Sequence, residues 1–391
     1  MELNLKTEQG AELNLDPVLK LESELNLKTV LAKIEAKLQA ECGRLGAAIP
    51  YIPQNGHYVD MREENLSWWT NGFWAGMLWQ LYHATGNELY RKTAEYSEDA
   101  MKQAMEQYMG LHHDVGFQLL HTAVADYRLT GKPEARVMGL HGANLLAGRF
   151  NPNGNYIRAW NKDMPGWMII DCLMNLPLLY WAGEELDDPR YGTIAELHTQ
   201  TVLKSLIRED GSCHHIVVKN PATGEDLEYP AGQGYASGSS WSRGQSWAVY
   251  GLALAFRHTG KTEYLNAAKR AAHYFIANVA ATGYVSLVDF RAPKEPVWYD
   301  TTATACAACG LLEIAELVGE AEKELYRSNG LRMIEALLAG HCNWNPEEDG
   351  ILQNGTVDYG SRTATHVPII YGDYFLVEAV LRVLKKDFLI W

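Results

Sequence analysis

The stretch Trp247-Ala-Val-Tyr-Gly-Leu-Ala-Leu-Ala-Phe256 decides the fold, together with the segments that follow it. It is apolar on every face of a helix, and a helix of this kind lies buried. His258-Thr-Gly-Lys-Thr262 comes next, and a glycine just past a helix, followed by a polar restart, is typical of an antiparallel helix pair. The segment Tyr264–Asn278 then carries a single apolar stripe. The sequence therefore predicts a buried helix paired with a peripheral one.

The same kind of turn recurs along the chain, at Gly86, Gly131, Gly183, Gly260 and Gly319. Helical periodicity on both sides of these turns alternates between segments that are apolar all round and segments with one apolar stripe. It predicts twelve helices, at about 29–43, 70–84, 88–109, 115–130, 133–148, 167–183, 189–206, 243–258, 262–279, 301–318, 321–339 and 367–387. Six buried and six peripheral helices in alternation predict an all-α protein, an (α/α)6 barrel of six helical hairpins.

The ring occupies nearly the whole chain. Its 391 residues would allow two domains, but the helical pattern runs without a break from Thr29 to the end. We therefore expect one catalytic domain at 29–391. Before it, Glu-Leu-Asn-Leu recurs at 2–5, 12–15 and 24–27, so residues 1–28 are predicted to be a polar appendage.

Composition excludes several classes of function. The net charge of −14 argues against non-specific nucleic-acid binding, which needs a basic surface. No apolar run approaches the roughly 20 residues that cross a bilayer, and the first residues carry no apolar signal region. The six cysteines are scattered, so we expect a cytoplasmic protein. The 12 Trp and 21 Tyr suit sugar faces, although Trp is also a good core residue.

The connections between the predicted helices are unequal in length. Those from a peripheral helix to the next buried one are mostly long, at about 44–69, 149–166, 207–242, 280–300 and 340–366. In an up-and-down ring these links emerge at one end, and long loops mark the functional end. The first residues of the buried helices should therefore meet at one mouth, where helix N-termini favour an anionic ligand.

Two carboxylates stand at this predicted mouth. Asp171 has Ile169, Ile170 and Leu173 as neighbours, and an apolar setting favours the protonated form that a general acid needs. The alternative is a satisfied polar residue of the core. Asp114 stands at the start of its helix beside a pair of histidines, where it is either a second catalytic carboxylate or an ordinary helix cap.

Arg243 stands between Trp241 and Trp247, where aromatic rings can brace a guanidinium that holds a carboxylate. A surface ion pair is the alternative. Three fragments resemble metal sites: His112-His113, Cys213-His214-His215 and Cys306-Ala-Ala-Cys309. A structural zinc site needs two such pairs at defined spacing, and the second pair is missing here. We therefore expect no metal and no cofactor.

Four motifs carry a resemblance to a known family. Trp69-Thr-Asn-Gly-Phe-Trp74, His112-His-Asp-Val-Gly-Phe117, Trp241-Ser-Arg-Gly-Gln-Ser-Trp247 and Tyr371-Gly-Asp-Tyr-Phe375 resemble those of the unsaturated glucuronyl hydrolases, glycoside hydrolase family 88. The resemblance extends from about Thr29 to the C-terminus. It implies a six-hairpin barrel that removes 4,5-unsaturated glucuronic acid from the non-reducing end of lyase-generated glycosaminoglycan oligosaccharides. An acid protonates C4 of the enol ether, water adds at C5, and the hemiketal opens.

The resemblance also implies roles for individual residues. Asp171 would be the acid and base, and Asp114 the second essential carboxylate, holding the ring hydroxyls. In the subsite around them, hydrogen bonds to the sugar would come from His113, His215 and Gln233, and ring platforms from Trp69, Trp160, Trp241 and Trp247. Arg243 would bind the substrate carboxylate, and Ser361 would contribute from the last loop. Either His214 or His215 would face the sugar.

Three other functions remain open at this point. An unsaturated rhamnogalacturonyl hydrolase would share the fold and the chemistry, although the runs at His112 and Trp241 favour the glucuronyl enzyme. A sugar 2-epimerase would instead use two histidines as acid and base, His113 with His215 or His366. A carbohydrate-binding barrel without activity would keep the tryptophan platforms and need no acid.

Overall fold

The computed structural model of the protein describes residues 27–161, 163–360 and 364–391. The predicted appendage, apart from its last two residues, and Ser361 lie outside the described residues. Of the helices in these ranges, none has the length and hydrophobicity that crossing a bilayer would require.

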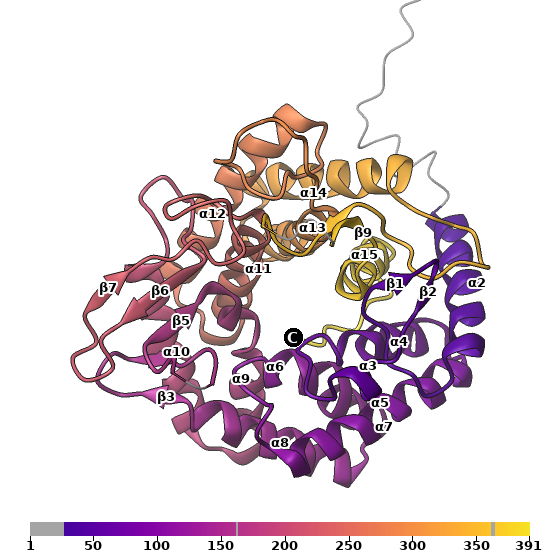
Figure 1. Ribbon diagram of the computed structural model, residues 1–391, viewed down its shortest axis with the longest axis horizontal. Coiled ribbons are helices and arrows are strands. Elements are labelled where there is room, and N and C mark those ends of the chain that lie inside the picture. Colours follow the sequence, from indigo (N-terminus) through magenta and orange to yellow (C-terminus); the bar gives the residue numbers. More distant parts are fainter. Residues whose placement is uncertain (1–26, 162, 361–363) are drawn as a thin grey trace, which may run out of the picture.

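Helices form two concentric layers around a ring (Figure 1). The inner layer contains α4 (Phe73–Thr85), α6 (Val115–Leu119) with η1 (Leu120–Val124) and α7 (Ala125–Thr130), η2 (Ile170–Met174) with α9 (Pro177–Leu186), α11 (Ser242–Thr259), α13 (Thr301–Leu317) and α15 (Ile370–Val383). The outer layer contains α2 (Leu27–Leu45), α5 (Glu88–Gln107), α8 (Pro133–Ala147), α10 (Pro189–Ser205), α12 (Thr262–Val279) and α14 (Glu320–Gly340). The last inner helix, α15, packs against the first, α4, and closes the ring. The predicted (α/α)6 barrel is confirmed.

Burial follows the two hydrophobic patterns. Every residue of α13 from Thr301 to Ala315 is buried, whereas α5 buries one stripe and exposes the rest. The turn that ends α11 is also as predicted, since Gly260 has φ 67° and donates its backbone N–H to the carbonyl of Phe256. This left-handed conformation favours glycine. Gly183 differs, because α9 continues past it to Leu186.

The predicted helix at 167–183 is wrong in its first half. Trp167–Ile169 forms strand β5, which pairs antiparallel with β6 (Ile216–Lys219), and a 3-10 turn follows at Ile170–Met174. The α-helix begins only at Pro177, a residue that suits a first helical turn and disfavours helix before it. Asp171 therefore lies in a short turn between a strand and a helix.

The long connections contain small antiparallel ribbons and short helices. These are β1 (Pro53–Gln54) with β2 (His57–Tyr58), α3 (Met61–Glu64), β3 (Phe150–Asn151) with β4 (Tyr156–Ile157), β7 (Asp226–Glu228) on β6, η3 (Ala280–Thr282), and β8 (Gly355–Thr356) with β9 (Thr365–Val367). Because β9 takes up Val367, α15 begins a few residues later than predicted.

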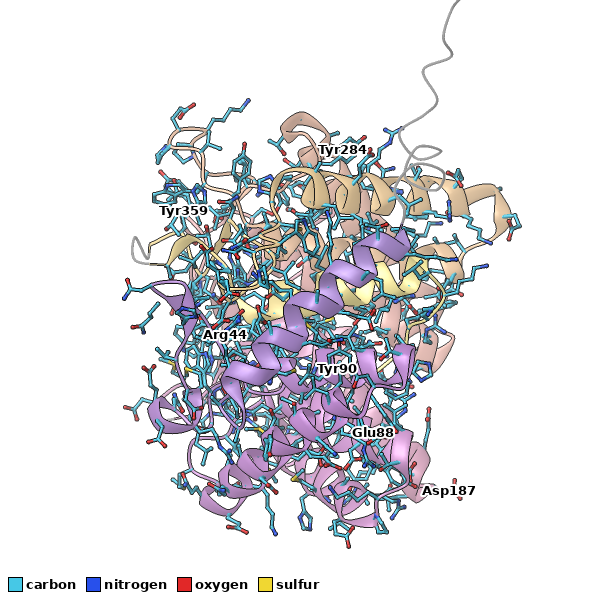
Figure 2. All side chains as sticks on the ribbon, turned by 90° about the vertical axis from the view of Figure 1, so that its right-hand side faces the viewer. Arg44, Glu88, Tyr90, Asp187, Tyr284 and Tyr359 are labelled. Atoms are coloured by element: carbon cyan, nitrogen blue, oxygen red, sulfur yellow. The ribbon has the colours of Figure 1, made fainter. Side chains whose placement is uncertain are left out.

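The chain ends inside the ring, where Figure 1 marks the C-terminus. The Trp391 side chain stacks on Phe375 with ring centroids 6.0 Å apart, and its Nε1 donates to Glu378 Oε2 at 3.0 Å. On the outside, α2 crosses the ring obliquely above Tyr90 (Figure 2), whose hydroxyl lies 3.5 Å from the carbonyl oxygen of Glu35. Aromatic side chains thus fill the centre, and α2 packs against α5 and the last inner helix, α15.

Candidate active site

Asp114 is the N-cap residue of α6, but its side chain accepts no hydrogen bond from the helix backbone. Its carboxyl group instead faces two histidine rings. His113 Nε2 lies 3.2 Å from Oδ1, and His112 Nδ1 lies 3.3 Å from Oδ2. Asp114 thus occupies the cap position without its side chain capping the helix, and its buried carboxyl group faces other side chains.

The hydrogen bonds of His113 locate a proton. Its Nδ1 lies 2.8 Å from the carbonyl oxygen of Ala159, which can only accept, so Nδ1 carries the hydrogen. In the neutral ring Nε2 is then an acceptor. Burial, with the nearby His112, holds the pKa of His113 well below its usual value, while burial and the charge of Asp171 raise the pKa of Asp114 well above its own. Both pKa shifts favour the neutral forms of the two groups, whose facing atoms, His113 Nε2 and Asp114 Oδ1, lie 3.2 Å apart.

Asp171 has a different partner. Its Oδ1 lies 3.5 Å from Nε2 of His215, while Nδ1 of the same ring accepts the backbone N–H of Gln233 at 3.0 Å. Because Nδ1 accepts, the ring hydrogen is on Nε2, the atom that faces the Asp171 carboxyl group. The side chain of Asp171 keeps 14% of its surface accessible, so it is less buried than a position inside a helix would make it.

His215, and not His214, faces the site. Its ring packs on Trp241 with centroids 4.4 Å apart. His214 is turned away, because the guanidinium of Arg208 binds its ring and Tyr229 packs on it at 4.2 Å.

Asn175 connects the carboxyl group of Asp114 to the backbone of Asp171. Its Nδ2 donates to Asp114 Oδ1 at 3.4 Å and to the Asp171 carbonyl at 3.3 Å, and its Oδ1 accepts the backbone N–H of Phe117 at 2.7 Å. Sequence reasoning missed this residue. The available signal was a polar side chain in an apolar run, one helical turn after Asp171.

Gly116 allows α6 to approach this turn. A Cβ atom added there would lie 2.5 Å from Cα of Asn175, well inside the normal contact distance between carbon atoms. The glycine of the His112–Phe117 motif is thus needed for the close contact that brings the segments of Asp114 and Asp171 together.

Arg243 already has a carboxylate partner inside the protein. Its guanidinium pairs with Asp300 at 2.6 Å, donates to the carbonyl of Thr356 at 2.7 Å, and packs between the rings of Trp241 and Tyr371. The side chain is only 1% exposed, so the surface ion pair is wrong. Where the sequence predicted a substrate carboxylate, the structure has the carboxylate of Asp300.

Comparison with known proteins agrees with this geometry. Residues 49–312 match the model of Glycosyl Hydrolase Family 88. The chain belongs to glycoside hydrolase family 88. It is 37% identical over 348 residues to an unsaturated glucuronyl hydrolase of Bacillus sp., which covers 87% of this chain and 92% of that protein. An unsaturated chondroitin disaccharide hydrolase of Streptococcus pneumoniae is 32% identical, with 83% of each chain covered.

Solved structures match this family 88 chain over most of its length. The crystal structure of unsaturated glucuronyl hydrolase from Streptococcus agalactiae superposes with a TM-score of 0.88 at 28% identity and covers 100% of both chains. The Bacillus sp. enzyme superposes with a TM-score of 0.87 at 33% identity, covering 91% of this chain and 96% of that one.

The four tryptophans predicted as platforms differ in exposure in this family 88 chain. Trp69 and Trp160 are partly exposed; Trp69 packs on Tyr371 at 5.0 Å, and Trp160 meets the ring of His113 edge-on at 6.3 Å. Trp241 and Trp247 are buried, and Trp247 packs on Phe117 at 5.4 Å. These two buried rings support their neighbours, and their role as sugar platforms stays a prediction.

The side chain of Gln233 is also engaged within the protein. Its Nε2 donates to the carbonyl of Val357 at 2.7 Å, and its backbone carbonyl accepts the N–H of Tyr359 at 2.9 Å. The backbone N–H of Gln233 binds the ring of His215. Gln233 thus connects His215 to the segment at Thr356 and Val357, which also binds Arg243.

One group of side chains in the described ranges has the ligand types and spacing that a metal would need. The ligand atoms of His112, His113 and Asp114 lie within 4.8 Å of one another. The Ala159 hydrogen bond leaves His113 Nε2 facing this group, 3.2 Å from Asp114 Oδ1. Cys306 and Cys309 are buried free thiols inside α13.

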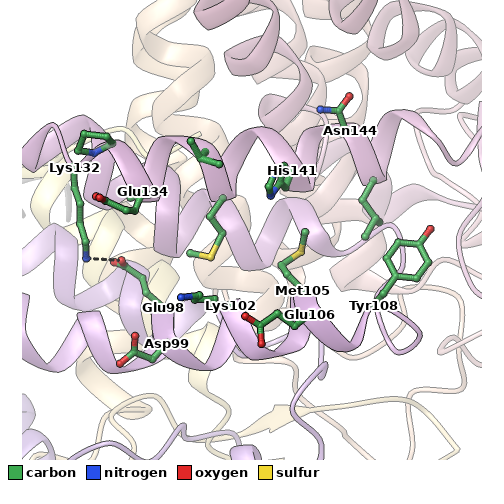
Figure 3. A pocket seen from close by; sticks show the side chains of 15 residues that line it. Glu98, Asp99, Lys102, Met105, Glu106, Tyr108, Lys132, Glu134, His141 and Asn144 are labelled. Carbon is green, nitrogen blue, oxygen red and sulfur yellow. Dashed lines mark ion pairs between the residues drawn. The ribbon is translucent and has the colours of Figure 1, made fainter.

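A separate hollow lies on the outer surface between α5 and α8 (Figure 3). The ammonium group of Lys132 lies 3.5 Å from the Glu98 carboxylate in its wall. Its lining includes none of the residues predicted for the site.

Proposed function

We propose that this family 88 chain removes 4,5-unsaturated glucuronic acid from the non-reducing end of lyase-generated glycosaminoglycan oligosaccharides. The observation that supports the proposal is the Asn175 amide, which joins the carboxyl group of Asp114 to the backbone carbonyl of Asp171 and so holds the two acidic residues beside one another. The names of the relatives support it. So does the solved structure of an Asp-to-Asn mutant of the Streptococcus agalactiae enzyme complexed with dGlcA-GalNAc6S.

An enol ether needs a single proton to become reactive. In the proposed reaction Asp171 gives its proton to C4, which leaves a cation at C5 that the ring oxygen stabilises. Asp171 then takes a proton from the water that adds at C5. The C5 hemiketal opens to a ketone, and the C1 hemiacetal that results releases the sugar. No covalent bond to the enzyme forms, and Asp171 ends in its starting state.

The surroundings of Asp171 suit this role. Its partial exposure lets solvent restore a proton that has been lost. Nε2 of His215 lies 3.5 Å from Oδ1, so a small approach of its N–H would stabilise the negative charge that develops as the proton leaves. The proposed acid thus has a hydrogen-bond donor within reach.

The surroundings of Asp114 suit a binding role. A buried, protonated carboxyl group adds no negative charge, so it does not repel the carboxylate of a uronic acid. It can hold ring hydroxyls by hydrogen bonds, while the partly exposed Trp69 and Trp160 offer ring faces to the sugar.

Three finer statements belong to the same proposal. The reaction needs no metal or other cofactor, because proton transfer to carbon and addition of water suffice. Residues 29–391 form a single catalytic domain. The protein is cytoplasmic, and the free thiol state of all six cysteines is the state expected in a reducing compartment.

The epimerase alternative requires two histidines that act on one carbon. Here His113 and His215 belong to two different carboxylates, and His366 accepts the backbone N–H of Tyr299. This pairing supports carboxylate chemistry.

The test uses an unsaturated chondroitin disaccharide made by a lyase. We expect the ultraviolet absorbance of its conjugated double bond to disappear when the protein is added, and a saturated disaccharide to remain intact. Absorbance that stays constant would contradict the proposal. If only unsaturated rhamnogalacturonan fragments lose their absorbance, the galacturonyl alternative is correct.

A further inference from the structure

The guanidinium of Arg149, the residue directly before β3, binds one short segment of the chain, residues 158–161. Nε donates to the Arg158 carbonyl at 2.9 Å, and Nη2 donates to the carbonyls of Ala159 and Trp160 at 2.9 and 3.1 Å. Nη1 donates to Oδ1 of Asn161 at 2.9 Å. Four acceptors, all uncharged, thus share one cation. No ion pair between described residues includes Arg149, so its charge lacks a carboxylate partner there.

The same segment holds His113. The Ala159 carbonyl that accepts from Arg149 also accepts from Nδ1 of His113 at 2.8 Å and from its backbone N–H at 3.4 Å. The ring of Trp160 stands against the ring of His113. His113 Nε2 in turn faces Asp114 Oδ1 at 3.2 Å. A continuous series of contacts therefore runs from Arg149 through Ala159 and His113 to Asp114.

We infer that Arg149 is a positioning residue for the hydrolase proposed above: by fixing the carbonyl of Ala159 it sets the tautomer of His113 and, through it, the orientation of the Asp114 carboxyl group. This inference rests on the proposed function. If the carbonyl moves away, Nδ1 of His113 loses its acceptor, the hydrogen can move to Nε2, and Asp114 then faces a donor. The carboxyl group must rotate or ionise to accommodate it.

The geometry requires arginine and not lysine. Arginine presents five N–H donors in a planar fork, which matches acceptors on several sides. Lysine has three donors on one atom and cannot reach the Arg158 carbonyl and the Asn161 amide oxygen together. Arg149→Lys therefore keeps the charge and loses the fork, whereas Arg149→Met loses both.

The charge of Arg149 gives a second, separable readout. At Asp114 this positive charge lowers the pKa, whereas burial raises it. At His112 burial and the charge of Arg149 act together and lower the pKa to about 4. The other titratable groups facing Asp114 are His112 and His113 on its own loop and Asp171 and Cys172 on η2. Arg149→Met should shift the pH dependence of kcat/KM upward, and Arg149→Lys should leave it near that of the wild type.

The experiment measures kcat, KM and the pH profile of the whole enzyme on the unsaturated chondroitin disaccharide. Both variants should lower kcat/KM about ten- to a hundredfold, and only Arg149→Met should shift the profile. The matched control is Arg128→Lys, since Arg128 donates to the carbonyls of Leu389 and Ile390 at 2.9 and 3.0 Å, away from the site. It should leave both kinetic readouts unchanged.

Outcomes separate the inference from the function on which it rests. A wild-type enzyme that leaves the disaccharide intact refutes the proposed function. An active wild type with unchanged kcat/KM in Arg149→Lys refutes the inference. Nitrogen-15 NMR of the histidine side chains gives a second measurement. Wild type should show the His113 hydrogen on Nδ1 and Arg149→Lys a mixture; an unchanged tautomer in the variant also overturns the inference. If Arg149→Met does not fold, Arg149→Lys carries the test.

Discussion

Replacing Gly116 with alanine should separate the two carboxylates without removing any functional group. The added Cβ would lie 2.5 Å from Asn175 Cα and 2.6 Å from its Cβ and its carbonyl oxygen. Carbon atoms pack at about 3.5–4 Å. Since a backbone atom is among those overlapped, no side-chain rotation relieves the contact, and α6 and η2 must move apart by about 1 Å.

The expected effects follow from this displacement. Overpacking of a buried site costs about 1–3 kcal/mol of unfolding free energy. A misplacement of about 1 Å between reacting groups costs about a hundredfold in rate. Asn175 can no longer bridge Asp114 and Asp171, so we expect Gly116→Ala to fold with reduced stability and to lose most of its turnover.

The assay is the loss of ultraviolet absorbance from the unsaturated disaccharide, together with urea unfolding. Gly192→Ala is the matched control, because that glycine lies in α10 with nothing within 4 Å of the added Cβ. It should keep full turnover and gain about 0.5–1 kcal/mol, the usual advantage of alanine over glycine in a helix. A Gly116→Ala variant with wild-type turnover would refute the reasoning.

Three further predictions concern the metal, the pH dependence and the centre of the ring. Prolonged treatment with a chelator should leave turnover unchanged, and a loss restored by a divalent cation would assign the His112 and His113 group to a metal. Asp114→Asn should be about as stable as the wild type near pH 4 and increasingly more stable than the wild type above it. The reason is that burial raises the pKa of Asp114 in the folded state, whereas the same group in the unfolded chain ionises near 3.9. A stability difference that urea unfolding shows to be independent of pH would contradict this. Trp391→Ala should cost about 3–5 kcal/mol in the same assay, since a large buried ring is lost and Glu378 loses a donor, and a cost below about 1 kcal/mol would show that the ring adds little.

The architecture was predictable because the local spacing of apolar residues indicates which faces of each helix are buried. The helix segment Trp247–Ala255 is apolar on all sides and is buried on all sides. The segment at 167–183 failed because Ile169 and Ile170 suit a strand as well as a helix, and only pairing with the distant β6 decides between them. The consequence reaches the site, since Asp171 is more exposed than a helix interior would make it.

The site was predictable only in part. Four motifs identified the family, and two of them meet in the structure, where Trp69 packs on Phe117 with ring centroids 5.6 Å apart. The partners of these residues were not predictable, because hydrogen bonds between distant segments leave no local pattern. Arg243 and Asp300 are 57 residues apart, and neither neighbourhood indicates the other. The roles of Asp171 and Asp114 remain predictions that mutation must test.

The most direct test of the account is the turnover of Asp171→Asn on the unsaturated chondroitin disaccharide. Asparagine preserves the size of the side chain but cannot transfer a proton to C4. We predict that this variant folds, binds the disaccharide about as tightly as the wild type, and leaves its ultraviolet absorbance intact. Near wild-type loss of absorbance in Asp171→Asn would contradict the central claim.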